Sequence, residues 1–94
     1  MQSDRFEWDD EKARTNIRGH GIAFADACYV FEDPFLDEDV DLREEYGEER
    51  VIATGLVGEI VLVVVYCVRG ARVRIISARR ARKREQQDYF QQRG

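Results

Sequence analysis

The chain has 94 residues, of which 44% are hydrophobic and 36% are charged, and its formal net charge is −4. This length fits one small domain spanning residues 1–94, and the composition excludes an intrinsically disordered chain. The longest apolar run, residues 60–68, is about half of the roughly 20 residues that a membrane-spanning helix needs. The N-terminus is acidic and polar, unlike a signal peptide. We therefore expect a cytoplasmic protein that makes no membrane contact.

Period-two alternation predicts a short edge strand at residues 5–8. A helix follows and runs to about residue 19, with Asp9 or Asp10 as its N-cap and glycines behind it. We expect Ala13 and Ile17 to form its buried stripe. A second short helix is predicted at residues 24–31 and ends before Pro34.

An acidic segment, residues 37–49, holds eight carboxylates and a single arginine. Residues 36–42 alternate weakly and predict a strand, and the rest predicts a loop. We interpret the segment either as a solvated, partly mobile connection or as a docking surface for a basic partner.

The second half of the chain predicts a sheet. Residues 50–56 and 59–68 form a hairpin about a turn at Val57-Gly58, and the continuously apolar second run predicts the central strand. A further strand is expected at residues 71–77, followed by a helix at residues 80–92. The order β-α-α-β-β-β-β-α predicts an α+β fold, in which a small antiparallel sheet of four to five strands packs against two N-terminal helices and one C-terminal helix.

The two cysteines, Cys28 and Cys67, lie in apolar surroundings without metal-ligand spacing, and we expect two reduced core thiols. No zinc spacing, phosphate loop, dinucleotide fingerprint or nucleophile elbow is present in the sequence. We therefore expect no metal and no cofactor.

Charge is divided unevenly along the chain. Residues 1–50 carry 6 basic and 16 acidic side chains, whereas residues 51–94 carry 9 basic and 3 acidic ones. A basic face on an acidic protein can still attract nucleic acid, because local potential steers the ligand. A solvated polar surface is the alternative, but the clustering of the arginines favours a functional basic face.

Five basic residues gather where the last strand is expected to pass into the last helix. Arginine offers a planar fork for phosphate, and helix N-termini also attract anions. The cluster therefore predicts an anion site, with generic surface basicity as the alternative. The cluster consists of Arg79, Arg80, Arg82, Lys83 and Arg84. Glu85 follows it directly, and either pairs with Arg82 or acts as an acid–base group.

Lys12, Asn16 and His20 lie four residues apart on the first predicted helix and so form one stripe. A lysine, an amide and an imidazole on one edge can grip a phosphodiester, and His20 can exchange a proton near neutral pH. Alternatively, His20 only complements the dipole at the helix C-terminus.

An ordered set of short motifs resembles the BrnT family over about residues 5–90. The set opens with Phe6-Glu7-Trp8-Asp9, Lys12, Asn16, His20-Gly21, Phe24-Ala25-Asp26-Ala27 and Val30-Phe31-Glu32-Asp33-Pro34. It continues with Glu49-Arg50, Gly55, Val63-Val64-Val65-Tyr66 and Arg69-Gly70, and closes with Arg74-Ile75-Ile76-Ser77-Ala78-Arg79-Arg80-Ala81, Glu85 and Tyr89.

The resemblance implies a ribonuclease toxin of a type II toxin–antitoxin module with a fold similar to RelE toxins. It implies metal-independent RNA cleavage that halts translation. It also implies neutralisation by a BrnA-like antitoxin in a hetero-oligomer, with DNA contacted only indirectly through that antitoxin. On the matched motifs, the catalytic candidates are His20, Arg79, Glu85 and Lys12. The RNA-binding candidates are Arg74, Arg80, Arg82, Lys83, Arg84, Asn16 and Trp8.

Three positions depart from the pattern of the family. Gly19 replaces a basic residue, and Cys67-Val68 replaces a threonine and a glutamate. These departures motivate the alternative of a non-catalytic module that binds RNA or the antitoxin and helps repress the operon.

Overall fold

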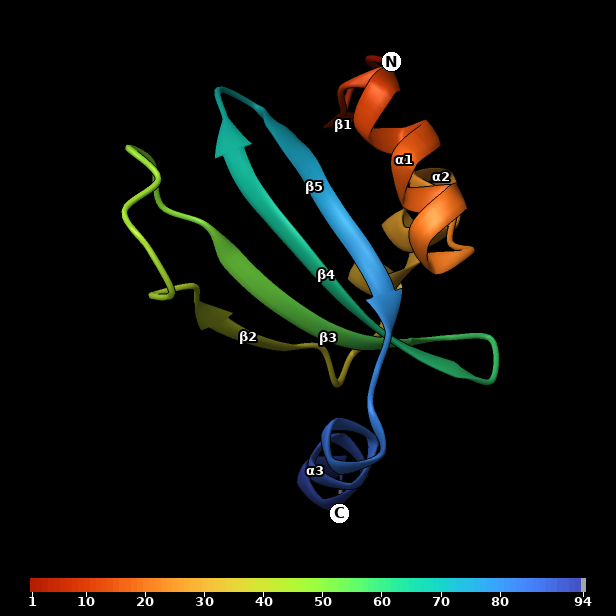
Figure 1. Cartoon of the computed structure of the whole chain (residues 1–94). Coiled ribbons are helices and arrows are strands. Elements are labelled where there is room, and N and C mark those ends of the chain that lie inside the picture. Colours follow the sequence, from red (N-terminus) through yellow and green to blue (C-terminus); the bar gives the residue numbers. More distant parts are fainter. Residues whose placement is uncertain (94) are drawn as a thin grey trace.

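The computed structural model describes residues 1–93 and confirms the predicted α+β class and element order. Figure 1 shows a twisted sheet with α1 and α2 beside β5, and α3 at the opposite end of the molecule. The elements are β1 (Phe6–Glu7), α1 (Asp10–His20), α2 (Phe24–Ala27), the 3₁₀ helix η1 (Cys28–Glu32), β2 (Asp37–Val40), β3 (Val51–Val57), β4 (Ile60–Arg69), β5 (Arg72–Arg80) and α3 (Lys83–Arg93). Within residues 1–93, no helix is long and apolar enough to cross a membrane.

The sheet has the strand order β1-β5-β4-β3-β2, so β4 is central, as its continuous apolar run predicts. The four longer strands form the predicted antiparallel meander, but β1 pairs with β5 in parallel. The purely antiparallel sheet that we expected is therefore corrected to a mixed one. Because many residues separate β1 from β5, no hairpin constrains their relative direction.

Side chains of β4 alternate between two cores. Leu62, Val64 and Tyr66 belong to the larger core beneath α1, α2 and η1. Val61 and Val63 point to the other face, where they pack with Tyr89 of α3. We call this second face the arginine face, because Arg74 and Arg79 of β5 also lie on it, opposite Cys67 and Val63 of β4. Helix α3 covers only one end of the arginine face (Figure 1).

The predicted helix at residues 24–31 divides into α2 and the tighter η1. The backbone of η1 then lies close against β3 at Gly55, where an added Cβ would come within 3.3 Å of the Val30 carbonyl oxygen. Gly55 therefore permits this close approach.

Helix α1 begins as predicted, because the side chain of Asp9 accepts a hydrogen bond from the backbone N–H of Lys12 at 2.9 Å. It runs through Gly19 to His20 and ends at Gly21, which adopts a left-handed conformation with φ of 70°. The predicted buried stripe is wrong at Ile17, whose side chain is exposed, and Asn16 is buried instead.

The burial of Asn16 follows from the position of α1 along the free edge of β5. The Asn16 amide accepts from the Ala78 N–H at 3.1 Å and donates to the Ala78 carbonyl at 2.8 Å. It also donates to the carbonyl of Ile22 at 2.8 Å. A polar residue is required here because buried backbone groups at a sheet edge need partners.

The expected boundary between the last strand and the last helix is also wrong. Strand β5 continues to Arg80, and a backbone hydrogen bond from Ala81 to Val61 extends the ladder further, so α3 begins only at Lys83. Arg79 and Arg80 are therefore strand residues. Both cysteines are free, with Cys67 buried and Cys28 half-buried, which agrees with reduced thiols.

Candidate functional site

A β-bulge determines which face of the sheet Arg79 occupies. The pairing of β4 with β5 shifts between Val65 and Tyr66, so that Val65 lies opposite Ser77, Tyr66 lies opposite Ile75, and Ile76 has no partner. Strict alternation from the buried Ile75 would direct Ser77 and Arg79 into the larger core. The extra residue reverses the alternation, which places Ser77 and Arg79 on the arginine face.

Glu85 of α3 then fixes the guanidinium of Arg79. The Nη1 and Nη2 atoms of Arg79 donate to the two Glu85 oxygens at 2.8 and 2.9 Å, and Nη1 also donates to the Arg80 carbonyl at 3.3 Å. Glu85 Oε1 further accepts from the backbone N–H of Arg82 at 2.7 Å, which closes the first turn of α3. One carboxylate therefore both caps the helix and positions the arginine.

This pairing decides the charge state of Glu85. The hydrogen bonds from Arg79 are the main cause that lowers the pKa of Glu85 to about 2. Such a carboxylate remains ionised at neutral pH and is a weak base, because effective acid–base groups have a pKa near the working pH. The sequence predicted either a Glu85–Arg82 side-chain pair or an acid–base role. The structure instead shows a pair with the Arg79 side chain and the Arg82 backbone.

Lys12 and His20 both line a hollow between α1 and β5. The hollow has a volume of about 340 Å³, and both residues are exposed at its rim. Ser77 also lines the hollow. Arg79 follows Ser77 by two residues on β5 and lies on the same face of the sheet, so the Arg79–Glu85 pair is one strand repeat away from a residue of the hollow.

Two of the predicted RNA-binding residues, Asn16 and Trp8, have their side chains engaged in contacts within the fold. The amide of Asn16 is buried and fully used at the edge of β5, so it is not free to contact RNA. Trp8 packs edge-on against the Phe24 ring at 5.8 Å and contributes to the larger core. Trp8 lies beside a different hollow, together with Arg5 and Cys28, so the structure does not bring it to the Arg79 site.

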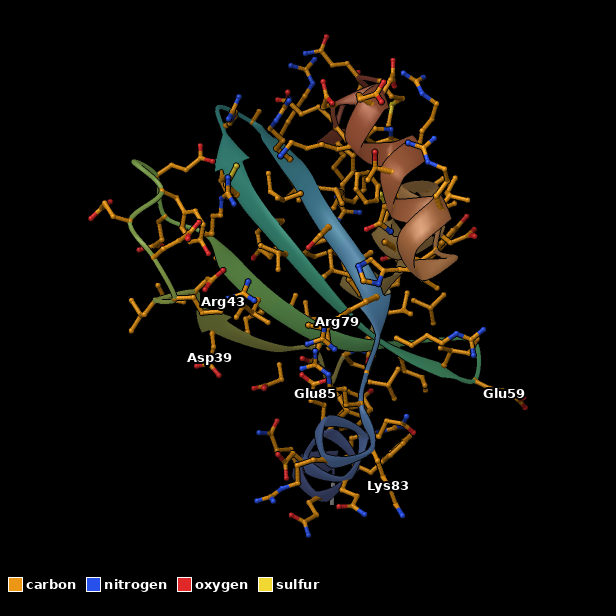
Figure 2. The ribbon with its side chains drawn as sticks, viewed as in Figure 1. Asp39, Arg43, Glu59, Arg79, Lys83 and Glu85 are labelled. Atoms are coloured by element: carbon orange, nitrogen blue, oxygen red, sulfur yellow. The ribbon has the colours of Figure 1, made fainter. Side chains whose placement is uncertain are left out.

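The remaining basic candidates do not form one compact cluster. Arg74 is held by Glu7 at 2.6 Å. Arg84 pairs with Asp88 at 3.5 Å on the exposed side of α3. Figure 2 shows Lys83 projecting outward from α3, away from Arg79 and Glu85. Arg80, Arg82 and Lys83 are exposed cations near the helix start.

The sequence did not single out three further polar residues that the structure holds in defined positions. Ser77 could not be assigned from the alternation pattern, because only the bulge places it on the arginine face. Arg43 and Asp41 lie within the acidic segment, where the presence of a single arginine is the only feature of the sequence that could have pointed to them. Asp41 is buried and forms an ion pair with Arg43 at 2.8 Å.

The arrangement as a whole places an oriented arginine at the edge of the arginine face, on a small α+β domain. Three N–H···O contacts occupy Arg79, which has five N–H groups, so two remain for a ligand. Among residues 1–93, no group of three or more histidine, cysteine or acidic side chains is placed to hold a metal ion.

Comparison with known families identifies this class of domain more closely. The sequence model of BrnT, the ribonuclease toxin of type II toxin–antitoxin systems, matches residues 8–85. The chain therefore belongs to the BrnT family of ribonuclease toxins, and membership in a type II system implies an antitoxin partner. No curated protein matches the chain.

Proposed function

We propose that this chain is a metal-independent endoribonuclease that cleaves RNA in the cytoplasm and thereby inhibits translation. The observation that carries the proposal is the fixed guanidinium of Arg79 on the arginine face, two residues along β5 from Ser77, which lines the hollow of Lys12 and His20. A cation held in place before the substrate arrives can stabilise charge that develops on a phosphate without reorganising.

The proposed reaction uses the ribose of the RNA as its nucleophile. The 2′-oxygen attacks the adjacent phosphorus and loses its proton, and the bond from phosphorus to the 5′-oxygen breaks. The 5′-oxygen takes up a proton, which leaves a 2′,3′-cyclic phosphate and a 5′-OH end. In this scheme Arg79 binds the phosphate, Lys12 neutralises charge and His20 moves a proton.

Glu85 has a different role in this proposal from an acid–base group. Because its pKa is about 2, it serves as the positioning residue for Arg79. The exposed cations at the start of α3 attract the RNA backbone over a longer range, since phosphate contacts by arginine and lysine supply most sequence-independent affinity. They are Arg80, Arg82, Lys83 and Arg84.

We further propose that the antitoxin is of the BrnA type and that it neutralises the toxin in a hetero-oligomer by covering the arginine face. Burying Arg79 would exclude RNA directly. Under this proposal, contact with operator DNA is made by the antitoxin and not by this chain.

One observation favours a second candidate, a binding module without catalysis. Glu85 occupies the guanidinium of Arg79 in the free chain, so the pair is electrically neutral before any ligand binds. Such a module would bind RNA or the antitoxin and contribute to repression of the operon.

RNA cleavage by the purified, partner-free chain separates the two candidates. Bacterial RNA would be incubated in EDTA with the wild type, with Arg79→Gln and with Arg14→Gln. Arg14 is a matched control, because it is an exposed arginine on α1 that is also ion-paired, to Glu11 at 2.7 Å. We expect cleavage with 5′-OH ends by the wild type and the control, and intact RNA with Arg79→Gln. Intact RNA with a folded wild-type chain would instead support the binding module.

A further inference from the structure

Within the acidic segment, Asp41 holds the side chain of Arg43 in a fixed position. The Asp41 side chain is fully buried, and both of its oxygens are used. Oδ1 accepts from the backbone N–H and the Nε of Arg43 at 3.1 and 2.8 Å. Oδ2 accepts from Arg43 Nη2 at 2.8 Å and from the hydroxyl of Tyr46 at 3.1 Å. A solvated, mobile connection would not require a buried carboxylate with four donors.

The surrounding loop supports this arrangement. The guanidinium of Arg50 lies over the Tyr46 ring at 4.1 Å, and the backbone N–H of Asp41 donates to the Arg50 carbonyl at 2.7 Å. Tyr46 is therefore held between Asp41 and the start of β3. The result is a fixed support for one side of the Arg43 guanidinium, whereas 65% of the Arg43 side-chain surface remains exposed.

Arg43 is directed toward the site already described. Figure 2 shows Arg43 lying over β3 on the side of the sheet that carries Arg79 and Glu85. Hydrogen bonding to Glu85 raises the pKa of Arg79, and the positive charge of Arg43 opposes that rise. Each arginine is oriented by its own carboxylate and keeps unused N–H groups, so neighbouring phosphates of one strand can accept hydrogen bonds from both.

We propose that Arg43 is a second phosphate-binding residue of the RNA site, and that it grips a backbone phosphate next to the one held by Arg79. Asp41 is its positioning residue. This inference rests on the proposed ribonuclease function. It adds to that function the binding of two neighbouring backbone phosphates, one by Arg79 and one by Arg43. Two Asp41 contacts use two of the five guanidinium N–H groups of Arg43, which leaves three for RNA.

Salt-dependent binding tests the inference without needing catalysis. The probe is a fluorescein-labelled, single-stranded 2′-O-methyl oligoribonucleotide, which lacks the nucleophilic 2′-OH. Its affinity would be measured by anisotropy at several KCl concentrations. The variants are Arg43→Gln, Arg43→Lys, Arg79→Gln and the Arg14→Gln control, with folding verified by urea unfolding.

We expect Arg43→Gln to weaken binding by about tenfold at low salt, as expected for losing one phosphate contact. The slope of log affinity against log salt should fall by about 0.7, the value for one phosphate contact on a single strand. Arg43→Lys should keep the slope, because it keeps the charge, but bind less tightly because it lacks the fork. Arg14→Gln should match the wild type in both quantities.

Two results would overturn the inference. They differ in whether the ribonuclease proposal fails as well. If Arg43→Gln binds with the affinity and slope of the wild type while Arg79→Gln binds weakly, Arg43 is outside the site and the ribonuclease proposal stands. If the wild type neither binds this probe nor cleaves RNA, both proposals fail together.

Discussion

Glu85 holds Arg79 through two parallel hydrogen bonds of 2.8 and 2.9 Å, joining the end of β5 to the first turn of α3. Each partner has about a third of its side-chain surface exposed, so the pair is accessible at the edge of the arginine face. A guanidinium in this position is fixed in orientation before a substrate arrives. The pair therefore explains why an acidic residue lies within a basic stretch of sequence.

Replacement of Glu85 by glutamine tests whether it positions Arg79 or transfers protons. Glutamine keeps the shape but removes the charge, so Arg79 loses its orientation and keeps its own charge. We expect RNA cleavage to fall by about tenfold, less than the effect of Arg79→Gln. The measurement is the single-turnover rate across a range of pH. An equally large loss, accompanied by the disappearance of one limb of the pH profile, would show instead that Glu85 is the proton-transfer group.

The same pair predicts a dependence of stability on acidity. Arg79 lowers the pKa of Glu85 from 4.5 to about 2 in the folded chain. The stabilisation is therefore fully present above about pH 4.5 and is lost as the pH falls toward 2. The free energy of unfolding, measured by urea titration, should fall more steeply over this range in the wild type than in Glu85→Gln. Parallel curves for the two proteins would show that the pair does not contribute.

Asn16 is expected to be a stability residue and not an RNA ligand. Asn16→Ala leaves the N–H and carbonyl of Ala78 and the carbonyl of Ile22 without their partner. A buried polar group left unpaired costs about 1–3 kcal/mol, so we expect a loss in that range or above it. Urea unfolding of Asn16→Ala and of the exposed control Thr15→Ala measures the difference. A variant as stable as the control would show that water replaces the amide.

Tyr89 anchors α3 to the sheet through Asp33. The Tyr89 hydroxyl donates to Asp33 Oδ2, which also accepts from the backbone N–H of Leu56 at 2.8 Å. Burial, followed by the Asp33 carboxylate, raises the pKa of Tyr89 to about 12, so the hydroxyl stays protonated and keeps donating. Tyr89→Phe keeps the buried ring and should cost about 1 kcal/mol. Urea unfolding that shows no change would mean that ring packing alone holds α3.

The sequence predicts the fold well where the pattern is local. The apolar run at residues 60–68 identifies the central strand, and the caps of α1 identify its start and end. The parallel pairing of β1 and the burial of Asn16 depend on contacts between distant parts of the chain. Polar Asn16 is required only because α1 lies along the free edge of β5.

The sequence proposes residues for the candidate site, but it does not predict how they are arranged. Arg79, Glu85, Lys12 and His20 were proposed from charge and from the family motifs, and the arginine cluster was expected at a helix N-terminus. The bulge at Ile76 breaks the alternation of β5, and residue types alone do not specify it. Without the bulge, the pattern assigns Arg79 to the face of Ile75, which is buried.

The most direct test of the proposed role of Arg79 in RNA cleavage is the single-turnover cleavage of one short RNA by the wild type and by Arg79→Gln. A matched RNA with a single 2′-deoxy substitution at the mapped cleavage site would be measured beside it. We predict that Arg79→Gln loses about 10²–10³-fold in rate, the usual cost of removing a preorganised group that stabilises charge in the transition state. The deoxy substrate should resist cleavage at that site, because it has no nucleophile. A rate for Arg79→Gln within twofold of the wild type, or cleavage of the deoxy substrate, would contradict the account.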